Sequence, residues 1–221
     1  HLSHSMILMF CLLMGIVGAR VIPFFTARAT ATTQSSTPRL NKIVLFVSLP
    51  ATALFVSSGF YPPLFSPGYL MLLSALLHLL RLGLWFTPKL LKHPLLWSLH
   101  LSYLAMALGL MLMAISLLTG LLYFKDMLHL VAISAMAAMM LSMMARVSLG
   151  HTGRPLLVSN LLALSFAAVL LSGVARTLAV LLAKPLLLWQ LSGALWLVAF
   201  LIFIRVYLPI LTSPRLDGRP G

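Results

Sequence analysis

Apolar residues in this chain form long continuous runs, separated by short polar stretches that contain proline. A helix needs about 20 apolar residues to cross a bilayer, and the runs have this length. They do not alternate with a period of two, which excludes a transmembrane barrel. Helices are expected, since each segment then satisfies its own backbone polar groups. The predicted membrane helices cover residues 4–22, 43–60, 64–86, 95–122, 127–147, 156–183 and 186–211.

Prolines lie near the ends of most runs and set the expected boundaries. Pro23 is expected to end the first helix, which places Arg20 one turn inside that end. Pro50, Pro67 and Pro209 fall within runs, where they are expected to kink the helices. We see no second domain, so residues 1–221 form one all-α unit, a polytopic bundle of about seven membrane helices. Because the chain opens at His1, we expect an N-terminal portion of a longer protein to precede it.

Composition supports a membrane protein. Of the 221 residues, 62% are hydrophobic and 8% are charged, against about 25% charged in a typical soluble domain. A compact soluble fold of this size has too much surface to hide so many apolar side chains. Soluble enzymes, disordered chains and disulfide scaffolds are therefore excluded, and the lone Cys11 cannot form an internal disulfide.

The net charge of +13 arises from 15 basic and two acidic residues. The basic residues are scattered between apolar runs, which favours anionic lipid headgroups as the partner and not nucleic acid. Alternating the loops places twelve basic residues on one side and three on the other, so the start is expected outside and the C-terminus in the cytoplasm. The twelve are Arg20, Arg28, Arg39, Lys42, Arg81, Lys89, Lys92, Arg146, Arg154, Arg205, Arg215 and Arg219; the three are Lys125, Arg176 and Lys184.

Histidines within the membrane are candidates for function, because polar residues there are costly. His78 and His100 lie toward the cytoplasmic ends of two helices joined by a short loop, so we expect them at similar depth. Two neutral imidazoles at one depth can hold a haem iron from both faces, whereas the alternative is that each forms a hydrogen bond across helices. Helical spacing also places His78 on one semi-polar stripe with Ser74, Arg81 and Trp85.

The helix predicted at 127–147 has two distinct faces when it is drawn with α-helical spacing. One face offers an imidazole and thioethers, from His129, Met136, Met140 and Met143. These groups suit Cu(I), although methionine is also an adaptable apolar filler. The opposite face carries small residues suited to close helix packing, namely Ser134, Ala138 and Ser142.

Arginines near the membrane lack acidic partners in this sequence. Arg20, Arg146 and Arg154 are candidates to pair with haem propionates or other anions, and the alternative is that they reach lipid phosphates. Gly150 and Gly153 frame a tight turn that presents His151 and Arg154. This turn is either a determinant of topology or an anion clamp, and His151 is either a metal ligand or a turn residue.

Two segments carry a resemblance to a known family. GARVIPFFT at 18–26 and HLVAISAMAAMMLSMMARVSLGHTGRP at 129–155 resemble the NnrS family, and Trp97, His100 and Tyr103 fit a further pattern associated with it. Small residues replace family glycines at Ser134, Ala137 and Ala19, which preserves close packing. The resemblance spans the whole chain, which would correspond to the C-terminal seven of about twelve helices.

The resemblance implies a protein of the bacterial inner membrane that contributes to nitric-oxide tolerance and contains haem and copper. Haem would lie between helices, with His78, His100 and His129 as candidate ligands and the arginines as propionate partners. Copper would use His129, His151, Met136 and Met140. Nitric oxide is then an expected ligand, although no catalytic residue is identified. The alternative function is a membrane transporter or permease subunit without a redox cofactor.

Overall fold

The computed structural model describes residues 1–182, 185–216 and 218, and these form helices and connecting loops without a strand. The predicted helix end at Ala183 and the loop cations Lys184 and Arg219 lie outside the described residues. Seven helical stretches in the described part are long and apolar enough to cross a membrane, which confirms the predicted all-α bundle. The elements are α1 (Leu2–Thr30), α2 (Pro38–Ser57), α3 (Gly68–Trp85), the short 3-10 helix η1 (Pro88–Lys92), α4 (Pro94–Thr119), α5 (Phe124–His129), the π-helix η2 (Leu130–Ala137), α6 (Ala138–His151), α7 (Asn160–Leu181) and α8 (Pro185–Thr212).

Local sequence explains most helix boundaries. α4 begins at Pro94, whose missing N–H costs nothing in a first turn. It ends at Thr119, and the following Gly120 adopts a left-handed conformation with φ of 68°. α7 begins after Ser159, whose hydroxyl accepts a hydrogen bond from the backbone N–H of Leu162 at 3.3 Å. The polar and proline-containing stretches therefore fix where the membrane helices start and stop.

The prediction that Pro23 ends the first helix is wrong. α1 continues through Pro23 to Thr30, because proline removes only one backbone donor and the other backbone groups still need partners in an apolar medium. In the part of α1 that follows Pro23, threonine hydroxyls donate to backbone carbonyls one turn earlier, as from Thr26 to Ile22 at 2.8 Å. α2 likewise runs through Pro50 without a break. These unbroken helices do not support the transporter alternative, which rested on mid-membrane interruptions.

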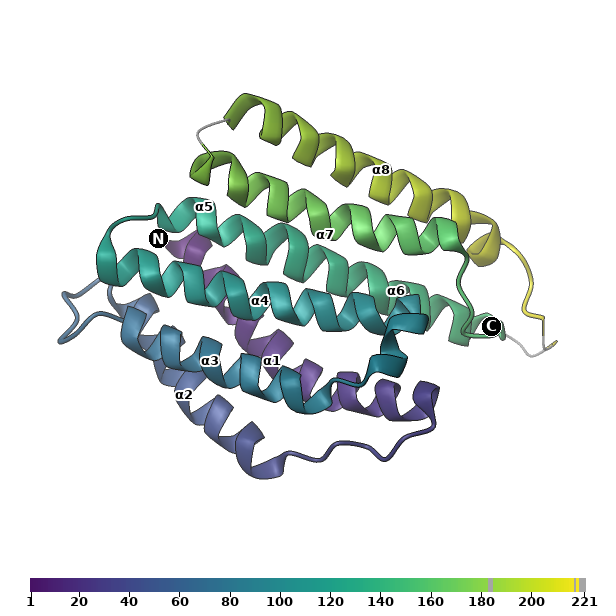
Figure 1. The fold of residues 1–221 in the computed structure, drawn as a ribbon, viewed down its shortest axis with the longest axis horizontal. Helices are drawn as coiled ribbons and strands as arrows, with labels where there is room; N and C mark the ends of the chain where they lie inside the picture. The colour runs from purple at the N-terminus through teal and green to yellow at the C-terminus, as the bar shows by residue number, and fades with distance from the viewer. Residues whose placement is uncertain (183–184, 217, 219–221) are drawn as a thin grey trace.

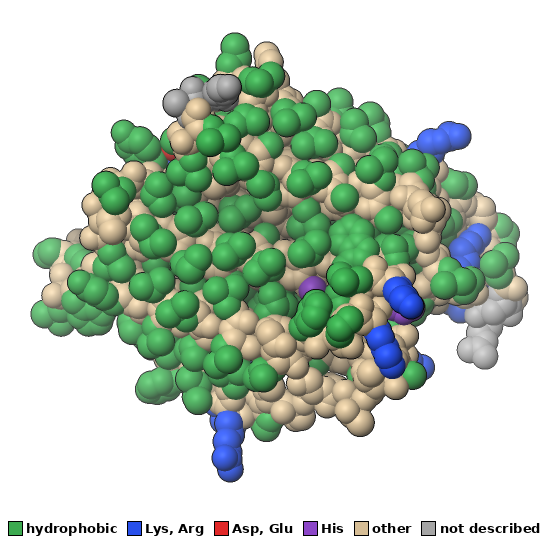
Figure 2. Space-filling model, in the orientation of Figure 1, with side chains coloured by type: hydrophobic (Ala, Val, Ile, Leu, Met, Phe, Trp, Pro, Cys, Tyr) green, Lys and Arg blue, Asp and Glu red, His purple; other side chains and the backbone are tan. Residues whose placement is uncertain are grey.

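Helices α2 to α8 follow one another across the molecule, and α1 crosses behind α3 and α4 (Figure 1). The two chain ends lie at opposite ends of the bundle (Figure 1), as an odd number of crossings requires. Hydrophobic side chains cover most of the visible face, and most visible Lys and Arg lie toward the end that holds the C-terminus (Figure 2). This distribution is that of a multi-pass membrane protein.

The fifth membrane crossing contains α5, η2 and α6 in one continuous helical stretch. The π-helix η2 bonds each N–H to the carbonyl five residues back, so its turns are wider than those of an α-helix. The α-helical spacing that placed His129, Met136 and Met140 on one face is therefore lost across η2. Ser134, Ala138 and Ser142, the predicted small-residue ridge, are all buried.

Two clusters of buried apolar side chains hold the bundle together. The first core joins α1 to α5 and η2, and includes Leu8, Phe55, Met71, Met106 and Val131. The second core joins α6, α7 and α8, and includes Leu141, Phe166, Val169, Ala199 and Phe203. α4 and the α5–α6 crossing contact both halves of the bundle.

Candidate functional site

His100 lies in the first part of α4, with 5% of its surface exposed. Its Nδ1–H donates to the backbone carbonyl of Leu96 at 2.9 Å, one helical turn earlier. This bond leaves Nε2 as the nitrogen that carries the free lone pair. Nε2 is buried and forms no hydrogen bond of normal distance and angle, although the backbone carbonyl of Trp85 also lies beside the ring. An imidazole oriented through Nδ1 with a free Nε2 is typical of a metal-ligating histidine.

His100 lines a cavity of about 660 Å³ between α3 and α4, here called the His100 groove. Such a volume falls within the range of about 300–1,000 Å³ that is usual for ligand and cofactor sites. Apart from His100 and Gly83 its walls are apolar: Leu79, Leu82, Phe86, Leu90, Leu91, Trp97, Leu101 and Leu104. The arrangement is one imidazole in an otherwise apolar pocket.

Gly83 forms part of this wall because it lies on the α3 face that points into the His100 groove. A Cβ placed on Gly83 would meet no atom within 4 Å. The glycine therefore leaves open space that a larger side chain would fill.

His78 belongs to a separate cluster on the other side of α3. Its Nδ1 accepts a hydrogen bond from the Tyr103 hydroxyl at 2.5 Å, and its Nε2 lies 3.5 Å from Ser48 Oγ. Arg81 donates to the same Tyr103 oxygen and, through Nη2, to the Gly15 carbonyl at 2.8 Å. The predicted stripe on α3 is confirmed, because Ser74, His78, Arg81 and Trp85 are all buried.

The structure does not bring His78 and His100 into one cavity. His78 lines two cavities beside α1 and α2, whereas His100 lines the groove between α3 and α4. Both nitrogens of His78 already have neighbours that match their hydrogen-bonding capacity. The pairing of His78 and His100 on one iron stays a prediction.

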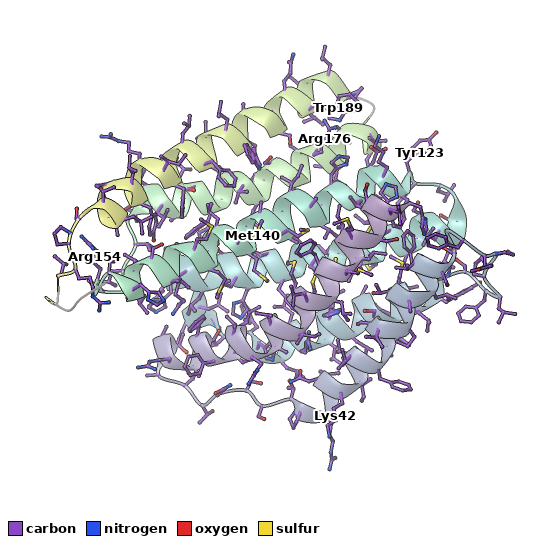
Figure 3. All side chains as sticks on the ribbon, turned by 180° about the vertical axis from the view of Figure 1, so that it is seen from behind. Lys42, Tyr123, Met140, Arg154, Arg176 and Trp189 are labelled. Atoms are coloured by element: carbon purple, nitrogen blue, oxygen red, sulfur yellow. The ribbon has the colours of Figure 1, made fainter. Side chains whose placement is uncertain are left out.

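His129 and His151 lie at opposite ends of the stretch from α5 to α6. Twenty-two residues separate them in sequence, or about 30 Å along a helix, so the two side chains cannot share one ion. Met140, labelled in Figure 3, is 56% exposed, whereas Met136 packs against the first core. Within the described part of the chain, no three His, Cys, Asp or Glu side chains lie together as a metal cluster would require.

The three predicted anion-pairing arginines lie apart from the His100 groove. Arg20 borders cavities beside α1 and α2. Arg146 lies over the ring of Phe25 at 3.9 Å from its centroid and lines another cavity with Arg28 and Lys92. Arg154, labelled in Figure 3, donates a hydrogen bond to the backbone carbonyl of Thr152 at 3.4 Å. None of these cations is among the groove-lining residues.

Arg81 is the functional candidate that sequence reasoning placed on a stripe but did not select. Its burial was signalled by the spacing of His78, Arg81 and Trp85 on one helical face. Its partners Gly15 and Tyr103 come from α1 and α4, and no local pattern in the sequence links them.

Comparison with known proteins gives one match. No curated protein and no solved structure matches the chain. The model of the family described as NnrS protein matches residues 1–215, nearly the whole length. The bundle of seven membrane-length helices agrees with the resemblance in the two motif segments. The chain belongs to the NnrS family.

Proposed function

We propose that this protein of the bacterial inner membrane contributes to nitric-oxide tolerance through haem held in the His100 groove, with His100 as a ligand to the iron. The single observation that carries the proposal is the buried, unpartnered Nε2 of His100, fixed by its Nδ1–H bond to Leu96 and placed on the wall of a large apolar cavity. Membership of the NnrS family supports haem as the group.

The groove suits a flat, mostly apolar group. Leucine and aromatic side chains from α3, η1 and α4 would pack against a macrocycle and keep water away from the iron. Haem, when bound, would supply an iron centre for small gaseous ligands or electron transfer. We infer that Lys89 pairs with a propionate, because it directly precedes the lining residues Leu90 and Leu91 in η1.

The experiment is a visible spectrum with iron analysis of the protein purified after haem-replete expression. The wild type is expected to show a Soret band, and His100→Ala is expected to lose most of its haem. His151→Ala is the matched control, because His151 is exposed at the C-terminal end of α6. Full haem content in His100→Ala, or its absence from the wild type, would reject the proposal.

His78→Ala decides whether a second histidine is involved. If His100 alone supplies the protein ligand, His78→Ala keeps its haem, because His78 belongs to the Tyr103 and Ser48 cluster. If both histidines bind one iron, each single variant changes the spectrum and the double variant loses the haem.

A further inference from the structure

Arg81 is a cation buried within the bundle, and among the described residues no acidic side chain is paired with it. It is 2% exposed and lies on α3. Its partners are the Gly15 carbonyl, the Asn41 side-chain oxygen, the Tyr103 hydroxyl and His78 Nδ1, and all of them are neutral groups. Its Nε–H is buried and has no hydrogen-bond partner. Burying a guanidinium without a counter-charge is costly, so the protein must gain something from keeping it.

A cavity of about 240 Å³ lies between α1 and α2 and reaches Arg81 and His78 on α3. Its polar lining comes from all three helices: Arg20, Asn41, Lys42, Ser48, His78 and Arg81. The ammonium of Lys42 extends away from the bundle (Figure 3), so the positive charge of the cavity comes mainly from the two arginines. The remaining wall is apolar, which strengthens electrostatic attraction inside.

The hydrogen bonds around Arg81 determine which of the neighbouring polar groups can donate a hydrogen bond. Arg81 can only donate, so the Tyr103 oxygen accepts from it and the Tyr103 hydroxyl donates to His78 Nδ1. The proton of His78 is then on Nε2, which is therefore a donor on the Ser48 side. Asn41 Oδ1 accepts from both Arg81 and Thr37 at 3.3 Å, so its NH2 group remains free to donate.

The loop between α1 and α2 borders a polar space next to this cavity. A second cavity of about 470 Å³ is lined by Gln34, Ser35, Ser36 and Thr37, and shares Ala19, Arg20 and Asn41 with the first. Along the hydroxyl, amide and guanidinium groups that line this second cavity, we expect a hydrophilic ligand to reach Arg81.

We propose that the cavity beside Arg81 binds a small inorganic anion, of the size and charge of nitrite, nitrate or chloride. A buried cation, a lining of donors and an adjoining polar space select for a negative ligand and against a metal cation. The volume has room for one such anion with a few waters, each of which occupies about 30 Å³. The inference stands apart from the proposed haem site, because the two cavities share no lining residue.

The test measures the thermal unfolding midpoint of the purified protein in detergent as nitrite, nitrate or chloride replaces gluconate at constant ionic strength. Gluconate is the control because it carries the same single charge and is much larger than the three test anions. A small anion at roughly a hundredfold excess over its Kd is expected to raise the Tm by about 5 °C or more. No response of the wild type to any of the three anions overturns the proposal.

The Asn41→Asp variant tests the anion site most directly. It places a carboxylate of nearly the same shape beside Arg81, where the Asn41 oxygen already lies 3.3 Å from Nη1. The protein then carries its own counter-charge, so the basal Tm is expected to rise and the response to added anions to fall at least tenfold in apparent affinity. Asn160→Asp is the matched control, because Asn160 is exposed at the start of α7. An undiminished response in Asn41→Asp contradicts the proposal.

Lipid phosphate is the other source of negative charge, and the measurement separates it from a free anion. The wild type is compared in detergent and in nanodiscs with or without phosphatidylglycerol. A Tm rise on free anion in lipid-free detergent supports the proposal. A rise that occurs only with phosphatidylglycerol, and never with free anion, overturns it.

Discussion

The two halves of the bundle bury polar groups in different ways. In the half built from α6, α7 and α8, serine hydroxyls donate to backbone carbonyls of a neighbouring helix, as from Ser165 to Ala199 at 2.7 Å and from Ser172 to Ser192 at 2.8 Å. In the half built from α1 to α4, buried polar groups contact one another beside cavities, and His100 and Arg81 keep nitrogen atoms without partners.

This difference distinguishes polar groups that hold helices together from polar groups that are free to bind a ligand. A hydroxyl bonded to a neighbouring backbone satisfies both groups and lets two helices approach closely. A charged or imidazole side chain with an unused nitrogen costs free energy, and such residues in a membrane mark sites that bind something. Arg146 of α6, whose Nε is also buried without a partner, lines a cavity with Arg28 and Lys92 and so belongs with the second group. We therefore assign packing to the contact between α7 and α8, and we propose ligand binding for the α1–α4 half.

Gly173→Leu is expected to give the largest loss of stability. A Cβ on Gly173 would lie 2.6 Å from the backbone nitrogen of Ser134, so α7 and η2 would have to separate. Overpacking of this kind costs about 1–3 kcal/mol, which lowers the Tm by roughly 2–4 °C for each kcal/mol. Thermal unfolding measures the loss. Haem per folded protein should not change, and a selective loss of haem would argue against the division between the two halves.

Gly83→Leu is expected to lower the haem content while the fold stays stable, which is the opposite of Gly173→Leu. The leucine would occupy open space in the His100 groove without meeting the backbone, so the fold remains while haem is displaced. We expect the haem-to-protein ratio to fall about tenfold, equivalent to about 1.4 kcal/mol of binding free energy. Gly193→Leu on α8 is the matched control, since its Cβ would also meet nothing within 4 Å. Equal haem content in both variants would place the haem elsewhere.

Ser165→Ala is expected to have the smallest effect of the three. It removes one hydrogen bond to the Ala199 carbonyl, and such interhelical bonds contribute about 0.6 kcal/mol on average in membranes. Unfolding in a graded detergent series measures this small change, with the exposed Ser57→Ala as the control. A change in the visible spectrum of Ser165→Ala would show that the α6–α8 half also shapes the cofactor site.

The sequence was sufficient to predict the helices and parts of their faces. Runs of about 20 apolar residues predict membrane helices because a bilayer leaves the backbone no other solution. The stripe of His78, Arg81 and Trp85 was predictable because α3 is a regular helix. The arrangement of His129, Met136 and Met140 was not predictable, because the π-helix η2 changes the spacing of side chains. No residue in the apolar run indicates that a π-helix forms there.

The partners of the buried groups were beyond sequence reasoning. Arg81 meets Gly15 and Asn41, which lie 66 and 40 residues away in the chain. The packing of both α1 and α2 against α3 brings these groups together (Figure 1). The free Nε2 of His100 likewise depends on which neighbours surround α4, and a single helix pattern does not contain that information.

The most direct test of the central claim is chemical rescue at His100. His100→Gly removes the imidazole and leaves a gap on the wall of the His100 groove, which free imidazole can enter. We predict that His100→Gly, expressed with haem, lacks the wild-type visible spectrum, and that added imidazole restores it in proportion to concentration. A wild-type spectrum in His100→Gly without imidazole would contradict the claim that this side chain holds the iron.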